Sequence, residues 1–283
     1  MVQMVQSKKK PANTLRIELH SHSTQSDGLH TPSQLAQKMR ESGVVGWALT
    51  DHDTTSGCAE AQKASQELGL VFIPGIEISA QEGRTIHILG LGVDPNLLTD
   101  YGVARRQDRV RRMELMAERA VELGLLEEGV QGGLLKHESP GRPHLARALV
   151  DAGVVSSVAE AFEQYLKPGG KLYIESPWPS VSSAISTIKS ANGVSVLAHP
   201  GKDRVEEGEL AKWVEQGLDG VEVMHPSHTE SEIARYRRMA DLLGILKSAS
   251  TDYHGTPKGD SRPGLDFPVS MWTPLAERLG VVF

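Results

Sequence analysis

The 283-residue chain contains a single cysteine, Cys58. An intrachain disulfide is therefore impossible, and so is a zinc site built from several cysteines. A lone thiol fits a reducing compartment, and we expect a cytoplasmic protein. No apolar run approaches the roughly 20 residues that a membrane-spanning helix needs. We therefore expect no association with a membrane.

Basic charge is also scarce, because 30 Lys and Arg residues face 36 Asp and Glu residues, for a formal net charge of −6. This balance excludes a general polyanion binder, and we expect no binding of duplex DNA and no obligatory protein partner. A phosphorylated substrate would have to be met by bound metals and a few Arg or Lys side chains. The polar, basic residues 1–14 lack the apolar core of a signal peptide, which predicts a disordered tail.

The chain does contain short apolar runs that alternate with amphipathic helices, the pattern of an α/β fold. Strands are expected near 15–19, 45–50, 70–73, 85–91, 194–198, 220–224 and 245–250. Helices are expected near 31–43, 57–68, 180–191, 206–216 and 229–243. Seven strands with helices between them predict a distorted, seven-stranded relative of the eight-stranded (β/α) barrel.

The alternation stops in the middle of the chain, where residues 100–178 contain only helical patterns. Helices are expected over 105–124, 142–153 and 158–166. We therefore predict that residues 15–99 and 179–283 form the barrel and that residues 100–178 are a helical insertion covering the active site.

Histidines and carboxylates recur at or near the ends of the apolar runs. A barrel brings the C-terminal ends of its parallel strands to one face, so ligands far apart in sequence can meet there. No single motif is strong, but chance rarely places nine nitrogen and oxygen ligands in this way. The nine candidate metal ligands are His20, His22, Asp27, His52, Glu77, His87, His199, Asp252 and His254.

Residue types and spacings suggest individual roles for some of these ligands. His20 and His22 have the i, i+2 spacing that places two side chains on the same side of an extended backbone. Glu77 is assigned the bridging and catalytic role, because a carboxylate can bridge two cations and a neutral imidazole cannot. Asp51 and Asp53 could orient His52 from outside the ligand shell.

The donor set indicates which metals fit. Imidazole and carboxylate ligands without thiolate suit Mn, Fe or Zn better than Ca or Mg. Clustered divalent metals generate a hydroxide nucleophile, bind phosphoryl oxygens and stabilise the departing oxygen. The alternative, a closed structural metal site, usually has four ligands, and nine ligands exceed that number.

Six motifs occur in the order ELHSHSTQSDG, ALTDHDT, PGIEIS, HILGLG, LAHP and STDYHG. With them, the chain resembles the polymerase and histidinol phosphatase (PHP) superfamily from residue 15 to about 257. PGRPH at 140–144 further resembles the branch of 3′,5′-nucleoside bisphosphate phosphatases and 5′→3′ exoribonucleases. This resemblance implies a distorted (β/α)7 barrel (PHP-type) with a helical insertion and a trinuclear centre, often with manganese.

The resemblance also implies how the ligands divide among three divalent metals, which we expect to be Mn²⁺, with Fe or Zn as alternatives. The first metal would be held by His20, His22, Glu77 and Asp252. The second would be held by Asp27, His52 and His254. The third would be held by Glu77, His87 and His199.

Substrate-binding residues are expected in the insertion. Arg142 precedes a helix that begins near Pro143, and a guanidinium beside a helix N-terminus suits a phosphate. His144 could assist, and Lys167 and Lys171 could meet a second phosphate. Arg105, Arg106, Arg109, Arg111 and Arg112 are expected on a solvated helix face.

One further residue is a candidate for proton transfer. His225 follows the strand near 220–224 and would face the same pocket. It is the candidate general acid for the leaving oxygen, although it could equally hydrogen-bond the substrate.

Taken together with this resemblance, the sequence predicts a metal-dependent phosphoesterase that removes the 3′-phosphate of nucleoside 3′,5′-bisphosphates by a metal-activated hydroxide. Its substrate would be a small phosphorylated nucleotide or a short RNA. The alternatives are a 5′→3′ exoribonuclease acting on short RNA and a phosphatase similar to histidinol phosphatase. A noncatalytic metal-binding module is the alternative from a different class.

Overall fold

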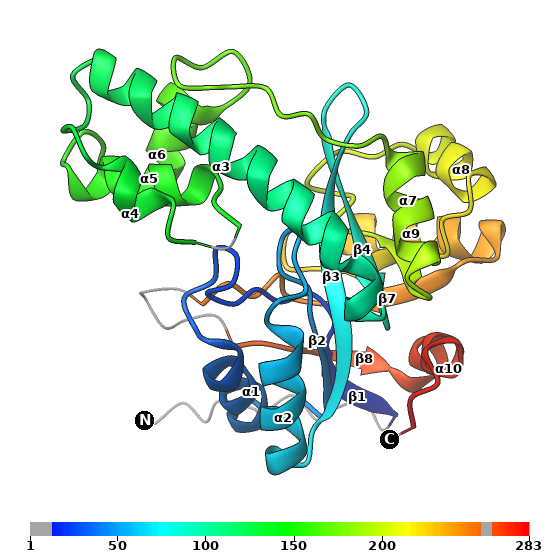
Figure 1. Cartoon of the computed structure of the whole chain (residues 1–283). Coiled ribbons are helices and arrows are strands. Elements are labelled where there is room, and N and C mark those ends of the chain that lie inside the picture. Colours follow the sequence, from blue (N-terminus) through cyan, green and yellow to red (C-terminus); the bar gives the residue numbers. More distant parts are fainter. Residues whose placement is uncertain (1–12, 138, 256–261, 283) are drawn as a thin grey trace, which may run out of the picture.

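The structure, a computed structural model, describes residues 13–137, 139–255 and 262–282. Eight strands form one sheet in the order β7-β6-β5-β4-β3-β2-β1-β8, which curls into a barrel with helices around it (Figure 1). The strands are β1 (Thr14–Glu18), β2 (Gly46–Leu49), β3 (Val71–Gln81), β4 (Thr85–Leu91), β5 (Val194–Leu197), β6 (Gly220–Met224), β7 (Leu246–Ala249) and β8 (Leu265–Pro268).

The helices alternate with the strands in the barrel and follow one another without strands in the insertion. Those of the barrel are α1 (Pro32–Glu41), α2 (Cys58–Leu68), α7 (Val181–Ser190), α8 (Glu207–Glu215), α9 (Glu230–Leu243) and α10 (Val269–Leu279). The middle of the chain forms η1 (Pro95–Leu98), α3 (Thr99–Glu122), α4 (Gln131–Leu134), α5 (Arg142–Asp151), α6 (Val158–Ala161) and the π-helix η2 (Phe162–Leu166).

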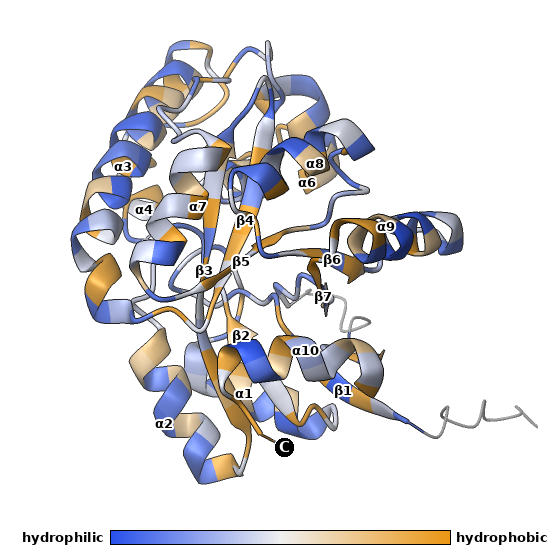
Figure 2. Ribbon diagram, turned by 90° about the vertical axis from the view of Figure 1, so that its right-hand side faces the viewer, coloured by the Kyte–Doolittle hydropathy of each residue, from blue (hydrophilic) through white to orange (hydrophobic). Residues whose placement is uncertain are grey.

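Six of the strands run in the same direction, so their C-terminal ends lie at one end of the barrel. β1, β2 and β3 pair in parallel, and β5, β6 and β7 do the same. β4 is antiparallel to both of its neighbours, and β8 is antiparallel to β1. The central strands are mostly hydrophobic (Figure 2), as expected for strands covered on both faces.

β3 joins the two halves of the sheet and carries Glu77. Its first residues pair in parallel with β2, and from Gly75 onward it forms a long hairpin with β4. A Cβ on Gly75 would lie 2.9 Å from the carbonyl oxygen of Leu49 and 3.1 Å from that of Gly90. Glycine therefore allows the close approach of three backbone segments two residues before Glu77.

The chain segments that follow β1 and β7 close the barrel at the end that carries the candidate ligands. The His22 amide donates to the Tyr253 carbonyl at 2.8 Å, and the Tyr253 amide donates to the His20 carbonyl at 3.1 Å. Ser21 and Tyr253 form a parallel bridge. The first and last candidate ligands in the sequence are thereby placed side by side.

The helical segment has an apolar cluster of its own. Its buried members include Met116, Leu145, Leu149 and Leu166, which come from α3, α5 and η2. In Figure 1 these helices gather to one side, at the end of the barrel where the site lies. The boundaries 100–178 stay a prediction, because α3 already begins at Thr99, without a break after η1.

The predicted α/β barrel with a helical insertion is confirmed. Three elements were not expected, namely α4, β8 and α10. Because of β8, the described residues contain eight strands and not the expected seven. The expected tail lies largely outside the described residues, but Thr14 belongs to β1. The capping box of Thr31 and Gln34 is present at the start of α1. Among the described residues, no helix combines the length and hydrophobicity that crossing a bilayer requires.

Candidate metal centre

The loop after β1 carries three of the nine candidate ligands. His20 and His22 are fully buried. The chain then turns back through a hydrogen bond from Gly28 N to Ser23 O of 2.9 Å, which brings Asp27 Oδ1 to 3.8 Å from His22 Nδ1. A Cβ on Gly28 would lie 2.2 Å from the His22 carbonyl oxygen, so this tight return requires glycine.

Glu77 lies at the centre of the cluster and is 1% exposed. One carboxylate oxygen, Oε1, has three imidazole nitrogens within 3.4 Å, and Oε2 has two within 3.2 Å. Both oxygens thus have imidazoles around them, although the two groups do not coincide with the expected ligand sets, because His20 and His22 lie at different oxygens. The histidines are His20, His87 and His199 around Oε1, and His22 and His52 around Oε2.

The first expected ligand set is completed by Asp252, which follows β7. Its Oδ1 lies 3.3 Å from His20 Nε2 and 3.2 Å from His22 Nε2. Asp252 has a φ of 52° and His199 a φ of 27°, both in the left-handed region that non-glycine residues avoid. Backbone strain of this kind persists where the surrounding structure holds a functional side chain in place.

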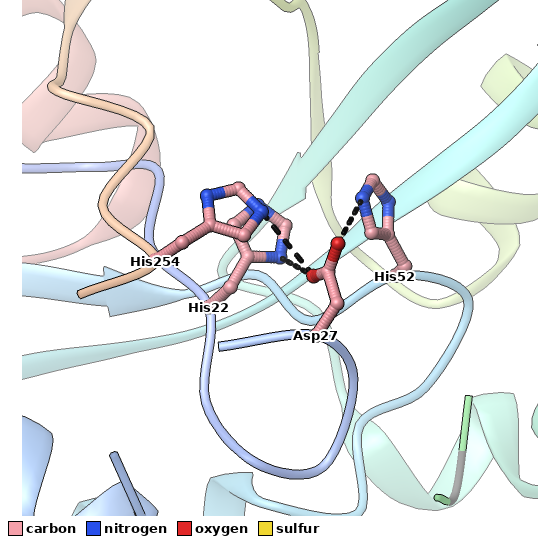
Figure 3. A group of neighbouring side chains, drawn as sticks. All are labelled: His22, Asp27, His52 and His254. Atoms are coloured by element: carbon pink, nitrogen blue, oxygen red, sulfur yellow. Dashed lines mark ion pairs between the residues drawn. The ribbon is translucent and has the colours of Figure 1, made fainter. Parts of the chain in front are cut away.

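The second expected set also comes together (Figure 3). Asp27 lies 3.2 Å from His254 Nε2 and 3.9 Å from His52 Nε2. His22 joins this group, and one ligand atom from each of the four side chains fits within 4.8 Å of the others. His22 therefore lies between the first and second sets.

The third expected set contains His87, His199 and Glu77. His87 Nδ1 and His199 Nε2 are 3.3 Å apart, and each lies near Glu77 Oε1. The compact cluster at this position joins His52, Glu77 and His87. The structure thus brings all nine side chains into one site, and the ligand role of each stays a prediction.

The charges in the site favour cations. Burial lowers the pKa of His20, but Glu77 and Asp252 outweigh this effect and hold the pKa well above its ordinary value. Burial raises the pKa of Glu77, but His52, His20 and His87 hold it well below its ordinary range. The carboxylates are therefore ionised and surrounded by imidazoles.

The donor atoms fit divalent metals. Several nitrogens and oxygens of the cluster are buried without a hydrogen-bond partner among the described residues, although they lie close together. Buried polar groups in this condition are rare and costly unless another group binds them. A cation would satisfy them together. The atoms that face the cluster are His20 Nε2, His22 Nε2, His52 Nδ1, and Glu77 Oε1 and Oε2.

Asp51 and Asp53 make other hydrogen bonds than those expected with His52. Asp51 accepts from the Ser23 amide and hydroxyl, each at 2.7 Å, and so holds the loop after β1. Asp53 accepts from Arg109 Nε at 2.9 Å and so ties β2 to α3. Both carboxylates fix the loops that carry ligands.

A cavity of about 300 Å³ opens beside the cluster. One wall contains candidate ligands, including Glu77 and His199. Another part of the lining comes from the insertion and contains Arg112, Arg142 and Phe162. The insertion therefore completes the pocket.

Arg112 and Arg142 are two guanidiniums with no carboxylate at ion-pair distance in the part of the chain that the structure describes. Arg112 lies 5.6 Å from the centre of the Tyr173 ring, and Arg142 lies 5.9 Å from the same centre. Burial and the charge of Arg142 lower the pKa of Arg112 to about 10. Two like charges in one cavity wall favour an anion between them.

The other expected substrate residues do not line this cavity. His144 Nδ1 accepts from the Gly141 amide at 3.0 Å, which supports the start of α5. Lys167 pairs with Glu163 on the surface, and Lys171 is exposed. A substrate role for the two lysines and for His144 stays a prediction, and the geometry gives it no support.

His225 lies next to the cluster, with its ring centre 5.8 Å from that of His199. Its Nδ1 accepts from the Ser227 amide at 3.1 Å, so the neutral ring carries its proton on Nε2. Burial lowers the pKa of His225 to about 4. The side chain is therefore a neutral donor near pH 7, and its role as a general acid stays a prediction.

Several residues of the site were not expected from the sequence. Arg105, Arg109 and Arg112 were assigned to a solvated face, but all three bind other parts of the chain. Their i, i+4, i+7 spacing places them on one face of α3, and this signal could have identified them. Lys202, whose Nζ lies 3.9 Å from Asp252 Oδ2, also lines the cavity.

Comparisons with known proteins agree on a family. The model of the PHP domain matches residues 18–176. A 3′,5′-nucleoside bisphosphate phosphatase of Chromobacterium violaceum is 34% identical over 255 residues, covering 86% of this chain and 88% of that protein. A 5′-3′ exoribonuclease of Haemophilus influenzae is 34% identical over 260 residues, covering 85% of this chain and 90% of that protein.

The named relatives differ in substrate. A phosphoribosyl 1,2-cyclic phosphate 1,2-diphosphodiesterase of Eggerthella lenta is 33% identical over 257 residues, covering 84% of this chain and 94% of that protein. A solved structure from C. violaceum, described as an amidohydrolase, superimposes with a TM-score of 0.83 at 33% identity, over 93% of this chain and 96% of that one. A solved structure from Bifidobacterium adolescentis, described as a putative metal-dependent phosphoesterase, has a TM-score of 0.79 at 31% identity. The match covers 97% of this chain and 99% of that one.

Proposed function

This chain belongs to the PHP domain family and is a metal-dependent phosphoesterase, and on that premise we propose that it hydrolyses the 3′-phosphate of nucleoside 3′,5′-bisphosphates. The observation that carries the proposal is the two-sided cavity. Candidate metal ligands line one part of it, and the guanidiniums of Arg112 and Arg142, which pair with no carboxylate among the described residues, line another. A substrate with two phosphates matches both parts.

In this proposal Arg142 and Arg112 bind the 5′-phosphate, which is not cleaved. Guanidiniums form paired hydrogen bonds with phosphate oxygens, and their stacking near Tyr173 restricts their orientation. The substrate is then held with its 3′-phosphate toward Glu77 and the histidines. Lys202, exposed beside Asp252, adds a positive charge at that end.

We assign three divalent metals, with Mn²⁺ as the favoured ion, to the nine clustered side chains. When bound, such metals supply the Lewis acidity that activates water and neutralises phosphoryl charge. Glu77 is the candidate bridge between ions, because imidazoles of all three expected sets lie within 3.4 Å of its two oxygens. A role for His225 in proton transfer stays a prediction, because its Nε2 is buried and the residue is not among those that line the cavity.

Phosphate release from a substrate panel tests the proposal. The chelated protein is supplied with Mn²⁺ and offered adenosine 3′,5′-bisphosphate, adenosine 3′-phosphate and adenosine 5′-phosphate. The bisphosphate should give the highest kcat/KM, and the product should be adenosine 5′-phosphate. Equal turnover of the two 3′-phosphates would remove the support for a second phosphate site.

A 5′→3′ exoribonuclease is the second candidate, favoured by the similarity to the H. influenzae enzyme. Both reactions break a 3′ P–O bond beside a 5′-phosphate, so the same cavity suits both. A 5′-phosphorylated dinucleotide added to the panel separates them. A higher kcat/KM on the dinucleotide than on the bisphosphate would favour the exoribonuclease.

A further inference from the structure

Glu222 is a fully buried carboxylate in β6 that belongs to none of the expected ligand sets. It lies beneath the metal centre and contacts three segments that carry candidate ligands. Its Oε2 accepts from the His199 amide at 2.7 Å, its Oε1 accepts from the Ser250 hydroxyl, and Oε1 lies 3.7 Å from His20 Nδ1. The His199 amide and the Ser250 hydroxyl are donors, and His20 Nδ1 lies at ion-pair distance.

The two nitrogens of His20 therefore face different surroundings. Nδ1 faces Glu222, and Nε2 faces Glu77 at 3.2 Å and Asp252 at 3.3 Å. A carboxylate at Nδ1 favours the tautomer with its proton on Nδ1, which leaves the lone pair of Nε2 directed into the cluster. Histidines that bind metals commonly depend on such an outer carboxylate.

His199 repeats the arrangement on the other side of Glu77. Its Nδ1 lies 3.2 Å from Asp203 Oδ2, while its Nε2 lies 3.4 Å from Glu77 Oε1. Asp203 is partly exposed, and its backbone oxygen accepts from Arg84 at 3.0 Å. Two histidines from different expected metal sets thus each have a carboxylate behind them.

We propose that Glu222 and Asp203 are positioning residues of the metal centre, which direct Nε2 of His20 and of His199 toward the ions. The inference rests on the proposed multinuclear centre and adds the residues that set its affinity. Glu222 serves the site of His20, and Asp203 serves the site of His199. Loss of either carboxylate should therefore weaken one ion and spare the others.

Glu222→Gln gives a sharp test, because the geometry determines how the amide must lie. The His199 amide can only donate, so the glutamine carbonyl oxygen has to replace Oε2. The glutamine NH2 group then replaces Oε1 and faces His20 Nδ1. It favours the tautomer with the proton on Nε2, the nitrogen needed for the ion.

Titration calorimetry with Mn²⁺ on chelated protein measures the effect. Wild type should bind several ions, and Glu222→Gln should bind one of them 10- to 100-fold more weakly, the usual effect of losing an outer partner. Asp203→Asn should weaken one ion to a smaller degree. With diamagnetic Zn²⁺ bound, ¹⁵N-histidine NMR should show His20 protonated on Nδ1 in wild type, and this signal should be weakened or lost in Glu222→Gln.

Ser250→Ala is the matched control, because it removes a hydroxyl that contacts Glu222 and leaves the carboxylate facing His20. Its Mn²⁺ titration should match wild type. If Ser250→Ala weakens Mn²⁺ binding as much as Glu222→Gln does, Glu222 has only a structural role and the inference is overturned. Unchanged Mn²⁺ titrations in both Glu222→Gln and Asp203→Asn would also overturn it. Failure of the wild type on the bisphosphate, with Mn²⁺ binding altered as expected, would overturn the proposed substrate alone.

Discussion

At the residue scale, the site depends on charges that are buried and matched to one another. Glu77 has five imidazoles around its two oxygens and is 1% exposed. Removing the charge of such a group leaves its partners buried without a counter-charge, which is far more costly than the loss of a surface pair.

Glu77→Gln is therefore expected to abolish nearly all turnover, because the amide keeps the size and loses the charge that would bridge two ions. The fold should persist in circular dichroism, and kcat is the measurement. Glu82→Gln is the control, since Glu82 lies in the turn after β3 and pairs with Lys212 on the surface. Turnover of Glu77→Gln close to that of Glu82→Gln would exclude the bridging role.

Arg142→Ala separates phosphate recognition from chemistry. A hydrogen bond to a charged group contributes about 1.5–3 kcal/mol, which corresponds to roughly a 10- to 150-fold loss in kcat/KM. This loss is expected on adenosine 3′,5′-bisphosphate and not on adenosine 3′-phosphate, with the metal content unchanged. The measurement is kcat/KM for both substrates in wild type and variant. Equal losses on both would assign Arg142 to the reacting phosphate or to structure.

At the scale of elements, the site depends on where strands end and how closely they approach. Glu77 reaches the centre because β3 passes between β2 and β4 with Gly75 at the crossing point. The i, i+4, i+7 face of α3 ties the insertion to the barrel through Arg109 and Asp53. The first of these contacts places the candidate ligand Glu77, and the second places the helices of the insertion that line the cavity.

Gly75→Ala is expected to lower the melting temperature, because the new methyl group meets the Leu49 carbonyl oxygen at 2.9 Å and cannot move without shifting backbone. Overpacking of this kind costs about 1–3 kcal/mol. Thermal unfolding measures it. Gly208→Ala is the control, since nothing lies within 4 Å of a Cβ there, in helix α8. A Gly75→Ala melting temperature equal to that of the control would contradict the packing described.

The elements also show what sequence could and could not predict. Buried parallel strands such as β2 and β5 were found because every residue in them is apolar or small. β8 was missed because Leu265–Pro268 is short and lies after a long connection. It is recognised as a strand only through its antiparallel pairing with β1. Long-range pairing of this type leaves no local pattern.

The candidate ligands could be located in sequence because histidines and carboxylates at strand ends are rare by chance. The residues that contact these ligands from outside the cluster could not be located in this way. In sequence Glu222 looks like an ordinary strand residue, and only the structure shows that the His199 amide, the Ser250 hydroxyl and His20 Nδ1 surround it. Arg112 faces Arg142 only because the helices of the insertion pack together, which depends on tertiary structure.

At the scale of the whole molecule, the candidate metal centre links segments that are far apart in the sequence, those after β1 and β7. Elemental analysis of protein purified without chelator is expected to find more than one transition metal per chain. Added Mn²⁺ should also raise the melting temperature of chelated protein, because a ligand that binds only the folded state stabilises it by about 2.7 kcal/mol at 100 times its Kd. At most one equivalent after reconstitution would exclude the trinuclear centre.

The closure of the barrel has a consequence for synthesis on the ribosome. Glu18 accepts from the Thr251 amide across 233 residues of sequence, next to the contacts that join His20 and His22 to Tyr253. A nascent chain displays its first ligands long before Asp252 and His254 are translated, so the entropy of closing this long loop is lost late. The full set of candidate ligands can therefore assemble only after Asp252 and His254 have been translated, and shorter nascent chains lack part of the site.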